Sequence, residues 1–171
     1  HTTMSTVGYA TWEKFQGFVD HKDFGDIRTA HIARGLPLSG FTEGYTRFAK
    51  ALIGVGDSAG TDKPVGFEIE FTALANPYTD DLSGGLPVQL TYQGQPRPLA
   101  QIEVFERAPD QAVNVFTTRT DAQGKAVVPV QPGRVYLLDA VVLRQPKADL
   151  AAERGIVWES LWAALTFAVP D

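Results

Sequence analysis

The sequence predicts a mainly β protein: an antiparallel β-sandwich of about seven strands with a short N-terminal helical segment. Three observations lead to this fold class. Segments after residue 65 alternate apolar and polar side chains, which is the period of a strand with one buried face. Turn-forming residues separate these segments at short intervals, as in a sandwich. Apolar residues before residue 54 recur instead at helical spacing.

Three short helices are expected in the first part of the chain. The first follows Thr11 as its N-cap, the second covers residues 25–34 and stops at Gly35, and the third follows Thr42 and stops at Gly54. Their apolar stripes are, in order, Trp12, Phe15, Phe18 and Val19; Ile27, Ala30 and His31; and Tyr45, Phe48, Ala49, Leu52 and Ile53. Helices this short are not stable alone, so we expect them to pack against the rest of the protein.

A glycine-rich stretch, residues 54–64, follows the third helix and ends in Pro64. Its composition is typical of a linker. The sequence therefore predicts two parts: residues 1–64, the helical segment with its linker, and residues 65–171, the β-sandwich domain. The formal net charge of −5 lies entirely in the second part, because the charges of the first part cancel.

Seven strands are expected in the second part. They cover residues 67–72, 88–92, 102–106, 113–118, 126–130, 134–143 and 156–169. In the first of them Glu68, Glu70 and Thr72 alternate with apolar residues, which predicts one face in water. Asp121 and Gly124 predict a tight hairpin turn, and Pro132-Gly133 predicts a second one.

Composition excludes several functional classes. The chain has no cysteine, so disulfides, thiolate metal sites and cysteine nucleophiles are excluded. No apolar run reaches the length of a membrane span, and the acidic balance argues against nucleic acid as a partner. We find no nucleophile elbow, phosphate-binding loop or dinucleotide fingerprint. The sequence therefore favours a protein that is not an enzyme.

Five side chains are candidate metal ligands. The amine and imidazole of His1 are able to chelate one ion, and a second imidazole from His21 or His31 would complete a site for Ni, Co or Cu. The alternative is that His21 is solvated and His31 fills a helix face. Glu68 and Glu70 share a strand face, about 7 Å apart, which suits a cation or paired acid–base work. The alternative for this pair is the solvated side of an edge strand.

Two further features have open alternatives. Asp80-Asp81 lies in a long loop and offers carboxylates for Ca²⁺, but lacks the ligand spacing of an EF-hand. Trp158 and Trp162 fall on one face of the last strand, where they would form a sugar-stacking platform or pack under the helices. We expect the second arrangement, since the helices need an apolar surface to cover.

Several blocks, in this order, resemble a family of bacterial periplasmic proteins described as periplasmic components of cobalt- or nickel-type uptake systems. The blocks are Tyr45–Leu52, Gly66–Glu70 with Asn76-Pro77-Tyr78, Leu90–Pro96, Thr120–Gly124 and Trp158–Phe167, so the resemblance spans residues 45–167. Residues 120–127 and 132–136, which contain the two predicted turns, resemble transthyretin-like modules. The expected sandwich is therefore transthyretin-like or immunoglobulin-like. The resemblance implies a non-enzymatic, extracytoplasmic binding or accessory protein. It would bind nickel, cobalt or a related metal ion and hand it to a membrane transporter without itself entering the membrane. The alternative is a structural or adhesive module that binds a partner protein or a glycan.

Overall fold

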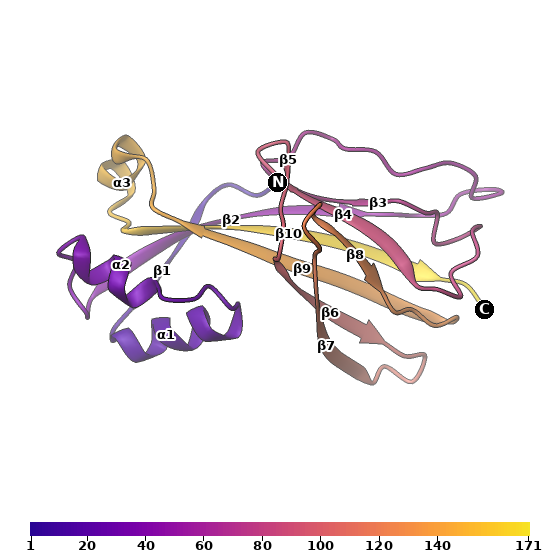
Figure 1. Cartoon of the computed structure of the whole chain (residues 1–171), viewed down its shortest axis with the longest axis horizontal. Helices are drawn as coiled ribbons and strands as arrows, with labels where there is room; N and C mark the ends of the chain where they lie inside the picture. Colours follow the sequence, from indigo (N-terminus) through magenta and orange to yellow (C-terminus); the bar gives the residue numbers. More distant parts are fainter. The chain divides into compact units, whose positions relative to one another are not determined.

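The computed structural model describes all 171 residues and confirms the mainly β fold class. Ten strands form two sheets of a β-sandwich, and three short helices accompany them (Figure 1). The strands are β1 (Ser5–Tyr9), β2 (Phe41–Ala51), β3 (Ile69–Ala73), β4 (Leu86–Tyr92), β5 (Gln95–Pro96), β6 (Gln101–Arg107), β7 (Val113–Arg119), β8 (Lys125–Val128), β9 (Arg134–Arg144) and β10 (Trp158–Val169). The helices are α1 (Trp12–His21), α2 (Ile27–Ala33) and α3 (Ala148–Arg154).

The larger sheet has the strand order β1-β2-β10-β9-β6-β7, and the smaller one has the order β3-β4-β5, with β8 also paired to β4. The seven strands expected from the alternation correspond to β3, β4, β6, β7, β8, β9 and β10. The sequence patterns did not predict β1, β2, β5 or α3. Helices α1 and α2 lie where the first two helices were expected, and Gly35 follows α2 with a φ of 67°.

The third expected helix is wrong, because residues 41–51 form β2 instead. Residues Ser5–Tyr9 pair with Phe41–Tyr45 in an antiparallel ladder, which supplies the backbone hydrogen bonds that a helix would have made internally. The apolar residues of β2 fit the period of a helix and also that of a strand, so pairing with neighbouring strands decided its structure.

Both turns expected to close hairpins form, but each joins two strands of different sheets. Asp121 Oδ1 accepts the N–H groups of Gln123 and Lys125 (both 2.8 Å), and Gly124 adopts a φ of 72°. The strand before this turn, β7, belongs to the larger sheet, whereas β8 pairs with β4 of the smaller one. The turn at Gly133 leads back from β8 to β9 of the larger sheet. These local signals therefore predicted the turns correctly and the strand pairing incorrectly.

The chain divides into two compact units, each made of separate stretches of sequence. We call them the sandwich unit (His1, Phe48–Ala140 and Trp162–Asp171) and the helical unit (Thr2–Arg47 and Val141–Leu161). Within the sandwich unit, alternate side chains of β4 are buried, and Tyr136 of β9 stacks on Phe167 of β10 at 5.3 Å between ring centroids. The core of this unit includes Ile69, Phe71, Leu86, Val88, Leu90, Ile102, Val104, Leu138 and Leu165.

The helical unit has its own aromatic core. Its central residues are Trp12, Phe15, Val19, Phe41 and Trp158. Trp158 is 4% exposed and lies under the helices, as expected, whereas Trp162 is not a member of this cluster. None of the three helices combines the length and the apolar character that crossing a membrane requires.

Candidate functional site

A cavity of about 600 Å³ lies in the sandwich unit, between the β2–β3 connection and the turn that follows β3. We call it the loop cavity. Its lining comes from residues 51–55, 58–63 and 65 of the connection and from Asn76, Pro77 and Tyr78 of the turn. The stretch interpreted as a linker is thus the wall of a cavity.

Side-chain hydrogen bonds hold the two walls together. The Asn76 amide donates to the carbonyl oxygens of Ser58 (2.7 Å) and Gly60 (3.0 Å). The Tyr78 hydroxyl donates to the carbonyl oxygen of Leu52 (2.6 Å). Because these donors come from one wall and the acceptors from the other, the cavity is formed before any ligand arrives.

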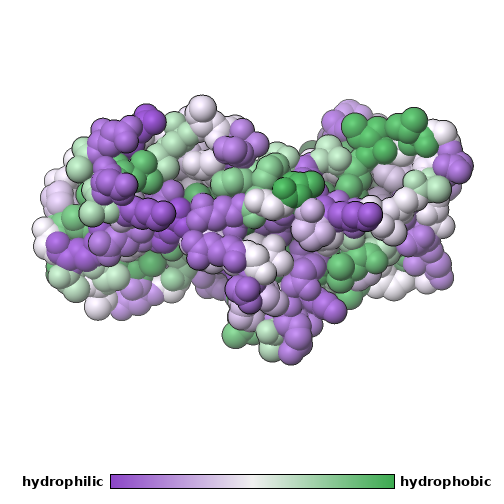
Figure 2. Space-filling model, turned by 90° about the horizontal axis from the view of Figure 1, so that it is seen from above, coloured by the Kyte–Doolittle hydropathy of each residue, from purple (hydrophilic) through white to green (hydrophobic).

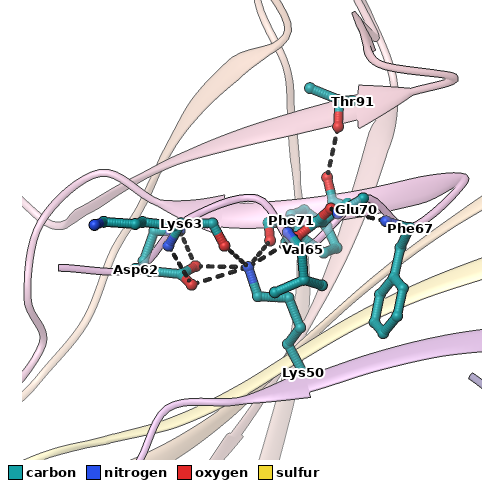
Figure 3. Close-up of polar contacts among 10 residues, drawn as sticks. Lys50, Asp62, Lys63, Val65, Phe67, Glu70, Phe71 and Thr91 are labelled. Carbon is teal, nitrogen blue, oxygen red and sulfur yellow. Dashed lines mark hydrogen bonds and ion pairs between the residues drawn. The ribbon is translucent and has the colours of Figure 1, made fainter.

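A charged network centred on Lys50 lies beside the cavity (Figure 3). The Lys50 ammonium contacts Asp62 (2.9 Å) and Glu70 (3.1 Å), and it donates to the carbonyl oxygens of Lys63 (3.0 Å) and Phe71 (2.9 Å). Asp62 also accepts the N–H groups of Lys63 and Ala73. Buried charges are tolerated when they are paired and hydrogen-bonded in this way.

Glu70 is 2% exposed, so the water-facing side expected for β3 is covered. Its carboxylate accepts the N–H groups of Val65 (2.7 Å), Gly66 (3.1 Å) and Phe67 (3.1 Å). Burial alone would raise the pKa of Glu70, but the Val65 N–H, the Lys50 ammonium and the Phe67 N–H together outweigh it and lower this pKa below its ordinary value. Glu70 therefore stays ionised and ties the connection to β3.

The titratable side chains in the lining of the loop cavity are Asp62, Lys63 and Tyr78. Asp62 is the only carboxylate in the lining, which contains no histidine, and this carboxylate is paired with Lys50. The hydroxyls of Ser58 and Thr61 would need an adjacent base to act as nucleophiles. Three lining side chains instead expose apolar surface: Ile53 is 78% exposed, Val55 80% and Val65 61%.

A second cavity, of about 450 Å³, lies at the other side of Tyr78, against the end of the chain. It contains Asp80, Asp81 and Asp171. Asp80 accepts a hydrogen bond from the Asn76 N–H (2.8 Å), and Asp81 accepts one from the Ser83 N–H (2.9 Å). Both carboxylates therefore stabilise the loop to which they belong. The Ser83 N–H lowers the pKa of Asp81.

The three histidines of the predicted metal site lie in different surroundings. The His1 ring stacks on Phe48 at 5.4 Å in the sandwich unit, and His21 ends α1 in the helical unit. His31 is fully buried: its Nδ1 accepts the Trp158 indole N–H (3.0 Å), and its Nε2 lies 2.9 Å from the carbonyl oxygen of Pro37, to which it must donate. Both nitrogens of His31 are therefore engaged within the protein.

The two predicted glutamate ligands are also engaged separately. Glu68 lies just before β3 and accepts a hydrogen bond from the Gln93 amide (3.1 Å), while Glu70 belongs to the Lys50 network. The structure contains no group of three or more histidine, aspartate or glutamate side chains that is able to hold a metal ion. The five candidate ligands are thus not gathered into one site.

One further buried carboxyl, Glu43, lies in the helical unit and lines neither cavity. Burial raises its pKa, although hydrogen bonds from the Ser160 and Tyr9 hydroxyls oppose this shift. Burial and the neighbouring Glu43 carboxyl in turn raise the pKa of Tyr9. Because neither described cavity reaches it, we interpret this cluster as structural.

Sequence reasoning missed Lys50 and Asp62, the two residues that organise the site. Lys50 was assigned to a helix and Asp62 to a linker. No local signal was available for this network, because Lys50 lies 20 residues before Glu70 and the lysine next to Asp62 in the sequence, Lys63, is not its partner.

These features define a β-sandwich protein with a preformed loop cavity. The chain belongs to the family described as a domain of unknown function, DUF4198, whose model matches residues 4–144. The match begins well before residue 45, so the helical unit's N-terminal stretch is part of the family domain, and it ends before the Trp158–Phe167 block. No curated protein and no solved structure matches the chain.

Proposed function

We propose that this protein is a non-enzymatic binding module and that the loop cavity receives its ligand. The observation that carries this proposal is the saturation of the charged groups beside the cavity. Lys50, Asp62 and Glu70 satisfy one another and the surrounding backbone, which leaves a partly apolar hollow with no free carboxylate in its lining. Preformed, mainly apolar hollows of a few hundred Å³ are typical of small-molecule sites.

An extracytoplasmic location and a membrane transporter as partner are part of this proposal. They rest on the resemblance to periplasmic components of uptake systems. A binding module of this kind would hold its ligand reversibly and release it to the partner, which requires no covalent chemistry.

The narrower form of the proposal makes Ni²⁺, Co²⁺ or Cu²⁺ the ligand. The five candidate ligands do not fit a metal site well, because His31 and Glu70 already make hydrogen bonds within the protein and no three of the candidates converge. Calorimetric titration with each ion tests this form. It requires saturable binding that is lost in a His1→Ala, His21→Ala double variant; binding that persists in this variant, or no binding at all, contradicts it.

An NMR screen of small organic molecules tests the main proposal. We expect at least one class of compound to shift the amide signals of residues 51–65 and 76–78. Ala59 is an exposed part of the cavity wall, so Ala59→Trp should fill the cavity and abolish these shifts. Ala122→Trp, at an exposed turn outside the cavity, is the control and should preserve them. If Ala59→Trp has no effect, or if no compound binds, the structural or adhesive alternative is favoured.

A further inference from the structure

Lys63 is the one cation in the lining of the loop cavity. Its main chain is fixed on both sides, because its N–H donates to Asp62 (2.8 Å) and its carbonyl oxygen accepts from Lys50 (3.0 Å). Figure 3 shows its side chain extending away from the Lys50 network, toward the opposite side from Glu70. The position of Lys63 is therefore set by the network while its ammonium takes no part in it.

No carboxylate of the lining pairs with the Lys63 ammonium. Asp62, the only carboxylate in the lining, is directed at Lys50. The two carboxylates of the network carry one charge more than Lys50, and five backbone N–H groups point at them: those of Lys63, Val65, Gly66, Phe67 and Ala73. Since the network is satisfied without Lys63, this ammonium is available to an outside anion.

Apolar surface lies in the same lining. Ile53, Val55 and Val65 are large aliphatic side chains, each more than half exposed. Figure 2 looks onto the side that carries the β2–β3 connection and shows strongly apolar side chains gathered there. Isolated exposed aliphatic residues are ordinary, whereas several around one hollow indicate a binding surface.

We propose that the loop cavity binds a small amphipathic anion: an aliphatic chain that packs on Ile53, Val55 and Val65, with one carboxylate paired to Lys63. A lysine is a compact point charge, so one oxygen of a carboxylate is enough to pair with it and no bidentate geometry is required. A volume of about 600 Å³ accommodates a chain of medium length. This inference rests on the proposed binding function and adds the ligand class.

The test compares three eight-carbon probes on the full chain: octanoate, octanol and octyltrimethylammonium. Dissociation constants come from amide shifts of residues 51–65. We expect octanoate to bind most tightly and octyltrimethylammonium most weakly. Lys63→Gln should weaken octanoate binding by about two- to fivefold, the range that a solvent-exposed ion pair produces, and should leave octanol unchanged. Lys125→Gln, which removes an exposed charge on β8 outside the cavity, should change neither.

The outcomes separate this inference from the proposed function. Equal affinities for octanoate and octanol, or an equal loss in Lys63→Gln and Lys125→Gln, would overturn the anion preference while the cavity remained a binding site. Tighter binding of octyltrimethylammonium would also overturn it. If no probe binds, or if Ala59→Trp leaves the binding of all three intact, the inference fails together with the assignment of the cavity.

Discussion

Glu43 and Glu70 are both 2% exposed, yet their pKa values move in opposite directions. For Glu43, burial dominates, because its partners are neutral hydroxyls. For Glu70, a nearby ammonium and backbone N–H groups stabilise the ionised form more than burial destabilises it. The kind of donor around a buried carboxyl therefore decides in which direction its pKa shifts.

This contrast predicts opposite pH dependences for two matched variants. The folded pKa of Glu70 lies below its ordinary value of 4.5, so the stability it contributes is present above that pH and is lost as the pH falls through the folded pKa. Glu70→Gln should lower the free energy of unfolding by about 3 kcal/mol at pH 7, since it breaks a buried ion pair. The difference from wild type should shrink as the pH falls below 4.5.

Glu43→Gln is the control, for which we expect the opposite dependence of stability on pH. The folded pKa of Glu43 is raised, so its contribution is fully present below 4.5 and is lost as the pH rises through the folded pKa. Urea unfolding of both variants between pH 3 and pH 7 measures the two trends. The same slope for both variants would contradict the opposite assignments.

A pair of glycines with the same backbone conformation separates strain from close packing. Gly124 and Gly94 have φ values of 72° and 73°. A Cβ on Gly124 would lie 2.7 Å from the Arg97 backbone nitrogen and 2.9 Å from the Leu90 carbonyl oxygen, whereas a Cβ on Gly94 would meet nothing within 4 Å. Gly94→Ala should destabilise by about 1–2 kcal/mol through left-handed strain alone.

Gly124→Ala should destabilise by clearly more than Gly94→Ala, because backbone atoms must move in addition. Thermal and urea unfolding of the two variants measures the difference. Equal destabilisation would show that the close approach at Gly124 has no energetic consequence.

Strand β2 shows why a hydrophobic stripe can mislead. Tyr45, Phe48 and Leu52 recur at helical spacing, but the same stretch contains β-favouring threonines and a glycine, Gly44. A Cβ on Gly44 would lie 2.8 Å from the side-chain ends of Ile156 and of Met4, so these two side chains pack closely over the strand where glycine leaves room. A glycine in the middle of an expected helix was the available signal against the helix.

Strand β7 forms the edge of the larger sheet, and its register predicts which residues tolerate proline. Just beyond the two ends of the β6–β7 ladder, the Ala108 N–H donates to the carbonyl oxygen of Ala112, and the Thr120 N–H donates to that of Ala100. By alternation Thr118 bonds to Ile102, while the N–H of Thr117 points outward. Thr118→Pro should therefore destabilise more than Thr117→Pro, by about 1–3 kcal/mol, because the buried Ile102 carbonyl loses its donor.

Urea unfolding of these two threonine variants checks the register directly. The two substitutions are at adjacent positions, and each replaces a threonine with proline. A larger loss of stability for Thr117→Pro would contradict this register, because it would mean that the Thr117 N–H bonds to β6 and that the Thr118 N–H points outward.

Across the molecule, local patterns predicted what depends on neighbours in sequence and failed where distant residues meet. Seven strands, two helices and the turn at Gly124 follow from alternation, capping and turn residues. The Lys50–Glu70 contact joins residues 20 apart across a connection that has no periodic pattern. Which sheet takes β8 likewise depends on its pairing with β4, which no turn residue encodes. The candidate ligands failed to converge for the same reason.

The division expected at residues 64 and 65 leads to a last prediction about how much of the chain the sandwich needs. A fragment of residues 65–171 lacks β2, which pairs with β10, and lacks both Lys50 and Asp62. Glu70 would then be a buried carboxylate without its cation, and β10 would have an unpaired edge. We expect this fragment to show poorly dispersed amide signals and no cooperative unfolding.

A fragment of residues 48–171 restores Lys50, Asp62 and part of β2, and includes nearly all of the sandwich unit. We expect it to recover dispersed spectra and a cooperative transition, with a further loss when Lys50→Met is introduced into it. If residues 65–171 alone unfold as cooperatively as residues 48–171, the Lys50 network is dispensable for the sandwich. The glycine-rich connection would then act as the simple linker that its composition suggests.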